Sequence, residues 1–200
     1  MRTNQKLSVS ALMLALGMVL PFFTGQIAVI GNMLLPMHIP VFLCGLLCGW
    51  RYGLFIGFSL PLLRGMVFGM PIVYPTGLAM AFELATYGIV VGYLYERSHK
   101  QGIRALYCAL LSAMVIGRVV WGCIEVMLLG VGGKLFTWEM FIASAFVQAI
   151  PGMLLQLILI PCVMLLLDHT GLICFHGREK EQIGICAVSY THLTLPTKLE

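Results

Sequence analysis

Four charged residues lie inside long apolar stretches of this 200-residue chain: Arg64, Glu83, Arg118 and Glu125. A charged side chain at the centre of a bilayer costs about 2.5–3.5 kcal/mol on insertion scales, so each one needs a partner or a purpose. Carboxylates and guanidinium groups at such depth can hold a polar ligand, or they can pair with one another and fix helix register. Both uses remain open from these four residues alone.

The spacing of the charges favours a shared pocket. Arg118, Trp121 and Glu125 are three and four residues apart, which places them on one face of a helix. An aromatic ring beside a guanidinium group can stack a planar ligand, so ligand contact is favoured for Arg118 and Trp121. Helical rise puts Arg64 roughly 9 Å and Glu83 roughly 10 Å below the outer ends of their spans, where they could meet. Gln148 is expected at a similar depth.

The composition indicates an all-α integral membrane protein. The chain is 60% hydrophobic and 10% charged, whereas soluble domains carry about 25% charged residues. The net charge of +4 does not indicate a nucleic-acid partner, because the basic residues fall in short clusters between apolar segments.

Clear apolar stretches cover residues 7–23, 76–95, 103–130 and 140–167, each near the roughly 20 residues of a membrane-crossing helix. The stretch 40–70 is interrupted by Trp50-Arg51-Tyr52. Two shorter helices with a turn there place nearly all basic clusters on one face, with Lys134 alone outside. The positive-inside rule therefore predicts a six-transmembrane-helix bundle with cytoplasmic N- and C-termini. The first helix is expected to be retained rather than cleaved.

Three connections then face outside, at residues 24–39, 67–75 and 131–139. The first two are apolar and rich in proline and glycine, which argues against continuous helix. Non-helical backbone at membrane depth must be buried in protein or line a cavity, so these loops are expected to cover a pocket. Simple interfacial loops are the alternative. Asn32 and His38 come from the first loop, where His38 is expected to make a hydrogen bond rather than bind metal.

Small residues recur four apart, a spacing that lets membrane helices approach closely. Most such pairs are expected to serve internal packing: Gly45 with Gly49, Gly65 with Gly69, Ala81 with Ala85, and Gly88 with Gly92. Ala11 and Ala15 lie on the terminal helix near the cytoplasmic side. They are expected to form a partner-docking face.

Several chemistries have no motif here. Gly133-Lys134 lacks the upstream glycine of a phosphate-binding loop, so ATP hydrolysis by that route is not expected. The sequence contains neither a His-Glu-x-x-His nor a Gly-x-Ser-x-Gly motif, and its seven cysteines lack metal-ligand spacing. No catalytic residue, metal or cofactor is predicted.

Four sequence blocks carry a family resemblance: Leu34-Leu35-Pro36-Met37-His38-Ile39-Pro40-Val41, Ala-x-x-x-Ala at 11–15, the segment 80–88 around Glu83, and Gly117-Arg118. From about Ser8 to Leu167 the chain resembles the substrate-binding S component of energy-coupling factor (ECF) transporters. The resemblance implies a multi-pass subunit of the bacterial cytoplasmic membrane that binds a vitamin near the outer face. It also implies docking through the alanine face onto a transmembrane coupling subunit, with two cytoplasmic ATPase subunits supplying the energy.

The expected substrate-binding residues are Asn32, His38, Arg64, Glu83, Arg118, Trp121 and Gln148. The two arginines favour an anionic vitamin such as pantothenate or a folate. If Glu83 and Glu125 neutralise them, a neutral or cationic ligand such as a pyridoxine or thiamine precursor is equally reasonable. A stand-alone secondary transporter or channel, and an intramembrane enzyme, remain alternative functions.

The hydrophobic pattern ends after Asp168, which predicts a membrane domain over residues 1–170 and a cytoplasmic tail over 171–200. Residues 185–200 have neither helical period nor basic anchor. They are similar to translated adapter or vector sequence and are expected to be non-native, with a disordered native tail as the alternative.

Overall fold

The computed structural model describes residues 3–23, 36–98, 102–131 and 150–169, and every regular element in these ranges is helical. The helices are α1 (Thr3–Phe23), α3 (His38–Cys48), α4 (Trp50–Phe68), α5 (Leu78–Arg97), α6 (Ile103–Val131) and α8 (Ile150–His169), with a short helical turn η1 (Val73–Gly77) before α5. The all-α class is confirmed over the part of the chain that the structure describes.

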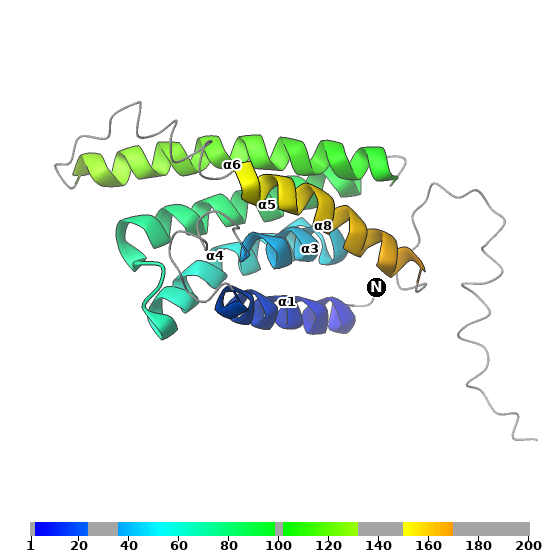
Figure 1. Ribbon diagram of the computed structural model, residues 1–200, viewed down its shortest axis with the longest axis horizontal. Coiled ribbons are helices and arrows are strands. Elements are labelled where there is room, and N and C mark those ends of the chain that lie inside the picture. Colours follow the sequence, from blue (N-terminus) through cyan, green and yellow to red (C-terminus); the bar gives the residue numbers. More distant parts are fainter. Residues whose placement is uncertain (1–2, 24–35, 99–101, 132–149, 170–200) are drawn as a thin grey trace, which may run out of the picture.

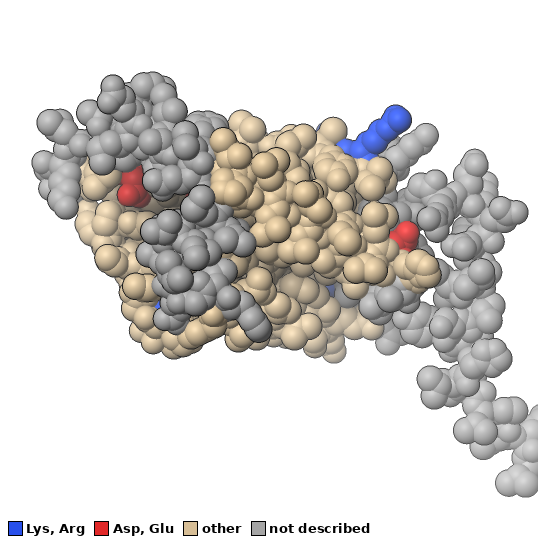
Figure 2. Space-filling model, in the orientation of Figure 1, with Lys and Arg blue, Asp and Glu red and all other residues tan. Residues whose placement is uncertain are grey.

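Four segments in the described ranges are long and apolar enough to cross a membrane: α1, α5 with η1, α6 and α8. Apolar side chains are exposed along their outer faces, for example Leu7, Val115, Met127 and Ile158. Figure 2 shows a surface whose middle is almost free of charge. An exposed apolar belt of this kind requires lipid around it. The chain is therefore a multi-pass α-helical membrane protein.

Helix α5 is the central element of the bundle, packed against α3, α4 and α6 (Figure 1). The largest apolar cluster joins α3, α5, α6 and α8 around residues such as Tyr87, Leu110 and Met164. A second cluster, which includes Leu60 and Leu84, joins α4 to α5. Polar residues on the central helix are consequently enclosed by its neighbours.

The predicted division of the stretch 40–70 into two helices is confirmed, and the break lies at Gly49. Gly49 has a φ of 99°, a conformation that glycine adopts without a steric penalty. The predicted packing role of the small residues is also confirmed at Gly45 and Gly88. A Cβ added to Gly88 would overlap the backbone of Gly53, and one added to Gly45 would lie 2.9 Å from the Gly88 carbonyl oxygen. Glycine therefore allows the close approach of α3 and α4 to α5.

The predicted connection at 67–75 is not a continuous helix: residues 69–72 lie in no helix, and Tyr74 breaks the short turn η1 that follows. Helix α4 ends at Phe68, Gly69 follows with a φ of 70°, and the Met70–Pro71 and Tyr74–Pro75 peptide bonds are cis. The Tyr74 hydroxyl donates a hydrogen bond to the Leu128 carbonyl oxygen at 3.1 Å. The connection is thereby fixed beside the C-terminal part of α6.

One loop prediction needs correction. His38 was expected within the first outer loop, but it is the first residue of α3 and is only 1% exposed. The residues that follow it, from Ile39 to Leu46, are all buried, so this short helix is embedded in the bundle. The rest of the expected loop at 24–35, and nearly all of that at 131–139, lie outside the described residues.

Candidate functional site

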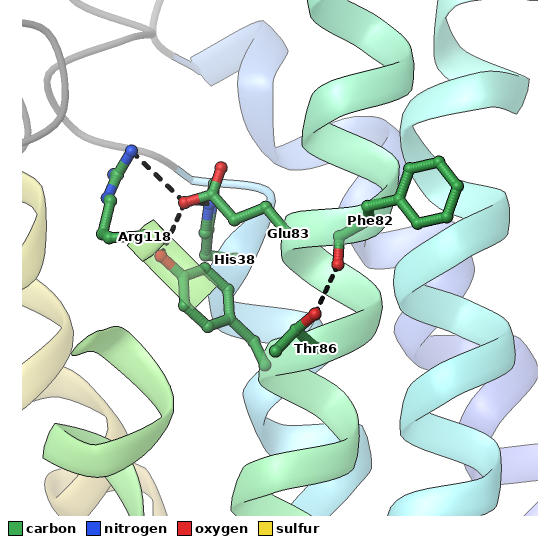
Figure 3. A network of polar contacts seen from close by, with 6 residues as sticks. His38, Phe82, Glu83, Thr86 and Arg118 are labelled. Carbon is green, nitrogen blue, oxygen red and sulfur yellow. Dashed lines mark hydrogen bonds and ion pairs between the residues drawn. The ribbon is translucent and has the colours of Figure 1, made fainter. Parts of the chain in front are cut away.

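Glu83 is the centre of a buried polar cluster between α5 and α6. Its Oε1 lies 3.2 Å from Arg118 Nη1, and Tyr87, one turn further along α5, donates a 2.6 Å hydrogen bond to the same oxygen. Glu83 is 1% exposed and Arg118 5%. A buried carboxylate needs both a counter-charge and hydrogen bonds. Arg118 of α6 supplies the counter-charge, and Tyr87 of α5 donates the hydrogen bond. Figure 3 shows the Arg118 side chain directed at the Glu83 carboxylate.

His38 approaches the same carboxylate from α3. Its Nε2 lies 3.9 Å from Glu83 Oε1, too far for a hydrogen bond. Within the described ranges neither ring nitrogen of this buried imidazole has a hydrogen-bond partner. The hydrogen bond expected for His38 is therefore not made there, but the imidazole does lie beside Glu83, with which the sequence analysis grouped it (Figure 3).

The Tyr87 ring is held from two sides. Phe42 of α3 stacks on it with ring centroids 5.0 Å apart, and a Cβ added to Gly117 of α6 would overlap the ring. Tyr87 was not among the predicted site residues. Its spacing of four from Glu83 could have identified it, because residues at that spacing are neighbours on a helix face.

Helix α6 presents Arg118, Trp121 and Glu125 on one buried face, as their spacing predicted. Trp121 packs against Ala79 of α5. Several polar atoms of this face lack a hydrogen-bond partner within the described ranges: Arg118 Nε, Arg118 Nη2 and Glu125 Oε2. Buried polar atoms are nearly always paired, so these donors and this acceptor call for water or a ligand.

Arg64 belongs to a different contact, which corrects the expected Arg64–Glu83 pair. Its Nη1 donates a 2.8 Å hydrogen bond to the Met18 carbonyl oxygen, and the guanidinium group lies over the Phe22 and Phe68 rings. Helical rise suggested that Arg64 and Glu83 lie at a similar depth, but depth does not determine rotation about the helix axis. The α4 face that carries Arg64 turns toward α1, and Arg118 pairs with Glu83 instead.

The remaining predicted residues divide into two groups. Ala11 and Ala15 are exposed on α1, where a partner could reach them. Asn32 and Gln148 lie outside the described residues, as does the expected tail from residue 171 onward. In the described ranges no group of three or more His, Cys, Asp or Glu residues could hold a metal ion.

A cleft of about 700 Å³ lies at the other end of the bundle, between the start of α1, the junction of α3 with α4, and the end of α5. Lys6, Arg51 and Glu96 line it. Glu96 is 13 residues beyond Glu83, which corresponds to roughly 20 Å along α5. This cleft is therefore separate from the Glu83–Arg118 cluster.

Comparison with known proteins gives one result. A family model described as "ECF transporter, substrate-specific component" matches residues 5–166. No match is found among curated proteins or among solved structures. The matched range contains all the helices that form the buried cluster.

Proposed function

The chain belongs to the family of substrate-specific components of ECF transporters, and we propose that it captures a vitamin or related micronutrient with high affinity for import. Members of this family are substrate-binding membrane subunits of ECF importers rather than enzymes. The proposed ligand site is the buried cluster of His38, Glu83, Arg118, Trp121 and Glu125.

The observation that carries this proposal is the set of unpaired polar atoms in the cluster. None of the residues Arg118, His38 and Glu125 is more than 7% exposed. Each nevertheless has at least one polar atom without a hydrogen-bond partner in the described ranges. A cluster that served only to brace helices would be expected to satisfy its own groups, because an unpaired buried polar atom destabilises the fold by about 1–3 kcal/mol. A polar ligand supplies the missing partners.

The proposed topology has six membrane helices with both termini in the cytoplasm of a bacterial cell. Lys6, Arg51, Arg97 and Arg104 lie at the beginning of α1, the beginning of α4, the end of α5 and the beginning of α6. Lys6, Arg51 and Glu96 line one cleft, which supports a common end for these basic residues. The positive-inside rule makes that end cytoplasmic. The ligand site then lies toward the outer face, beside the connection between α4 and α5.

The proposed partners are a transmembrane coupling subunit and two cytoplasmic ATPase subunits, which supply the energy that this chain has no motif to generate. Ala11 and Ala15 are the proposed docking contacts, and their exposure on α1 supports that role. Asn32 and Gln148 remain predicted ligand contacts.

The contacts of the two arginines argue against an anionic vitamin. It required two guanidinium groups facing the pocket. Arg64 contacts Met18, Phe22 and Phe68 on the α1 side. The charge of Arg118 is balanced by Glu83. The alternative from the sequence analysis, a neutral or cationic ligand, is therefore favoured.

Purification of the chain alone tests the proposal. The chain is solubilised, the small molecules that co-purify are identified by mass spectrometry, and their affinity is measured by equilibrium dialysis. We expect a dissociation constant in the nanomolar range, corresponding to about −12 kcal/mol, for a water-soluble vitamin or precursor. Uptake of the molecule by the chain alone under an ion gradient would instead indicate a secondary transporter. Chemical conversion of the molecule would indicate an enzyme.

A further inference from the structure

We infer that the ligand of this site carries a cationic, nitrogen-containing group that binds Glu125, attached to a planar ring that lies beside Trp121. The inference rests on the proposed function and names the chemical class of its substrate. It depends on the charge balance of the cluster and on the order of three side chains along α6.

The charge balance of the described residues leaves the Glu125 carboxylate without a counter-charge. Glu83 and Arg118 form an ion pair at 3.2 Å. Within the described ranges no Lys, Arg or His nitrogen lies within 4.0 Å of Glu125, and Arg64 is engaged on the α1 side. The described charged groups of the site therefore sum to −1 when His38 is neutral. A ligand with one positive charge makes the occupied site neutral.

Burial makes the uncompensated carboxylate significant. Glu125 is 7% exposed, and its Oε2 has no hydrogen-bond partner in the part of the chain that the structure describes. A carboxylate at this depth in a membrane helix needs a counter-ion or a hydrogen-bond donor. Glu83 already has both, from Arg118 and Tyr87. Glu125 is thus the group in the cluster for which a ligand cation is the missing partner.

The order of residues along α6 gives the shape of the ligand. Arg118 and Glu125 are seven residues apart, or roughly 10 Å along the helix, and Trp121 lies between them on the same buried face. At one end Arg118 Nε and Nη2 are available to donate hydrogen bonds. At the other end Glu125 accepts. An indole between them suits a flat, electron-poor ring, because a cationic ring is attracted to an aromatic face.

These features together describe an elongated heteroaromatic cation. One end has a hydrogen-bond acceptor, such as a hydroxyl or ring nitrogen, that faces Arg118. The ring lies beside Trp121, and the positively charged or amino-bearing nitrogen faces Glu125. An anionic ligand would place a second negative charge beside Glu125, and like charges in a buried site are strongly unfavourable.

The test measures binding of three probes of different charge to the purified chain in lipid nanodiscs by isothermal titration. Thiamine is the cationic probe, pyridoxine the neutral probe and pantothenate the anionic probe. We expect thiamine to bind most tightly. We also expect Glu125→Gln to weaken thiamine binding on the order of 30-fold or more, since it removes one partner of a buried charge pair.

Glu96→Gln is the matched control, because Glu96 is an exposed carboxylate near the end of α5. It should leave all three affinities unchanged. Glu125→Asp keeps the charge, so it should retain the preference for thiamine over pantothenate even at reduced affinity. This second variant preserves the test if Glu125→Gln fails to fold, which thermal unfolding would reveal.

Two outcomes overturn the inference but leave the proposed function standing. One is tighter binding of pantothenate or pyridoxine than of thiamine. The other is unchanged thiamine affinity in a folded Glu125→Gln variant, which would mean that Glu125 does not contact the cation. Failure of every probe to bind, together with the absence of any co-purifying small molecule, would contradict the proposed function itself.

Discussion

Single residues decide whether the buried charges of this protein serve binding or packing. Glu83 Oε1 forms an ion pair with Arg118 and accepts a hydrogen bond from Tyr87. Glu125 and the free atoms of Arg118 are incomplete in the part of the chain that the structure describes. The site thus combines an ion pair that joins α5 to α6 with polar atoms that a ligand can bind.

A mutant cycle tests the satisfied pair. Arg118→Met leaves Glu83 as an uncompensated buried charge and should destabilise the protein by about 3–5 kcal/mol. The double variant Glu83→Gln with Arg118→Met removes both charges and should recover a substantial part of that loss. The free energy of unfolding, measured by SDS titration in mixed micelles, checks this. A double variant at least as unstable as the sum of the two single variants would show that the pair contributes no stability.

Tyr87→Phe tests the hydrogen bond to Glu83 separately. The phenyl ring keeps its contacts with Phe42 and Gly117, while the 2.6 Å bond to the charged carboxylate is lost. Hydrogen bonds to charged groups contribute about 1.5–3 kcal/mol, so unfolding free energy should fall by about that amount. Tyr93→Phe, at an exposed position on the same helix, provides the comparison and should change stability much less. Equal effects of the two variants would argue against a special role for Tyr87.

The sequence predicted part of this residue-level picture. The spacing of Arg118, Trp121 and Glu125 was sufficient to place them on one face, because helical periodicity determines it. The partner of Glu83 was not predictable in the same way. Expected depth suggested Arg64 as the partner, but Arg64 is directed toward α1, where it contacts Met18. Tyr87 was overlooked because a tyrosine in an apolar helix has no signal beyond its spacing from Glu83.

At the scale of elements, α5 positions the site because glycines let its neighbours approach. Gly88 lies against Gly53 and Gly45, and α6 carries Gly117 where the Tyr87 ring packs. The break at Gly49 separates α3 from α4, so that α3 can present His38 and Phe42 to the cluster. The interruption of the apolar stretch at Trp50-Arg51 predicted this break from the sequence. The burial of α3 was not predictable, because an eleven-residue, mostly apolar helix is equally compatible with an interfacial position.

Gly88→Ala tests the helix contact. The new Cβ would overlap the Gly53 backbone, so α4 and α5 must separate. Overpacking of this kind costs about 1–3 kcal/mol, and the unfolding free energy in mixed micelles should fall accordingly. Gly130→Ala is the matched control, since a Cβ there meets no atom within 4 Å. Comparable destabilisation by both variants would mean that the loss of glycine, and not the contact, is responsible.

At the scale of the whole molecule, binding and partner docking are proposed to use different surfaces. The ligand cluster lies among α3, α5 and α6. Ala11 and Ala15 are exposed on α1, which contributes none of the cluster's side chains. The family assignment and the multi-pass helical architecture could be predicted from the sequence, since composition and motif blocks determine both. The identity of the ligand could not, because it depends on which buried charges pair.

Ala11→Trp separates the two surfaces. A large indole on α1 would block close contact with a coupling subunit, so uptake by the assembled transporter should be lost while ligand affinity stays within about twofold. Val115→Trp on α6 places the same bulk on another exposed position and should leave uptake largely intact. Parallel loss of affinity and uptake in Ala11→Trp would contradict a docking role.

Ligand uptake into proteoliposomes tests the central claim most directly. The chain is reconstituted alone, and again together with an ECF coupling subunit and two ATPase subunits. Each preparation is assayed with and without ATP on the side of the membrane where the ATPase subunits lie. A substrate-specific component should bind its ligand in both preparations but transport it only in the complete assembly with ATP. Accumulation of the ligand by the chain alone, at a rate unaffected by the partner subunits and ATP, would contradict the account.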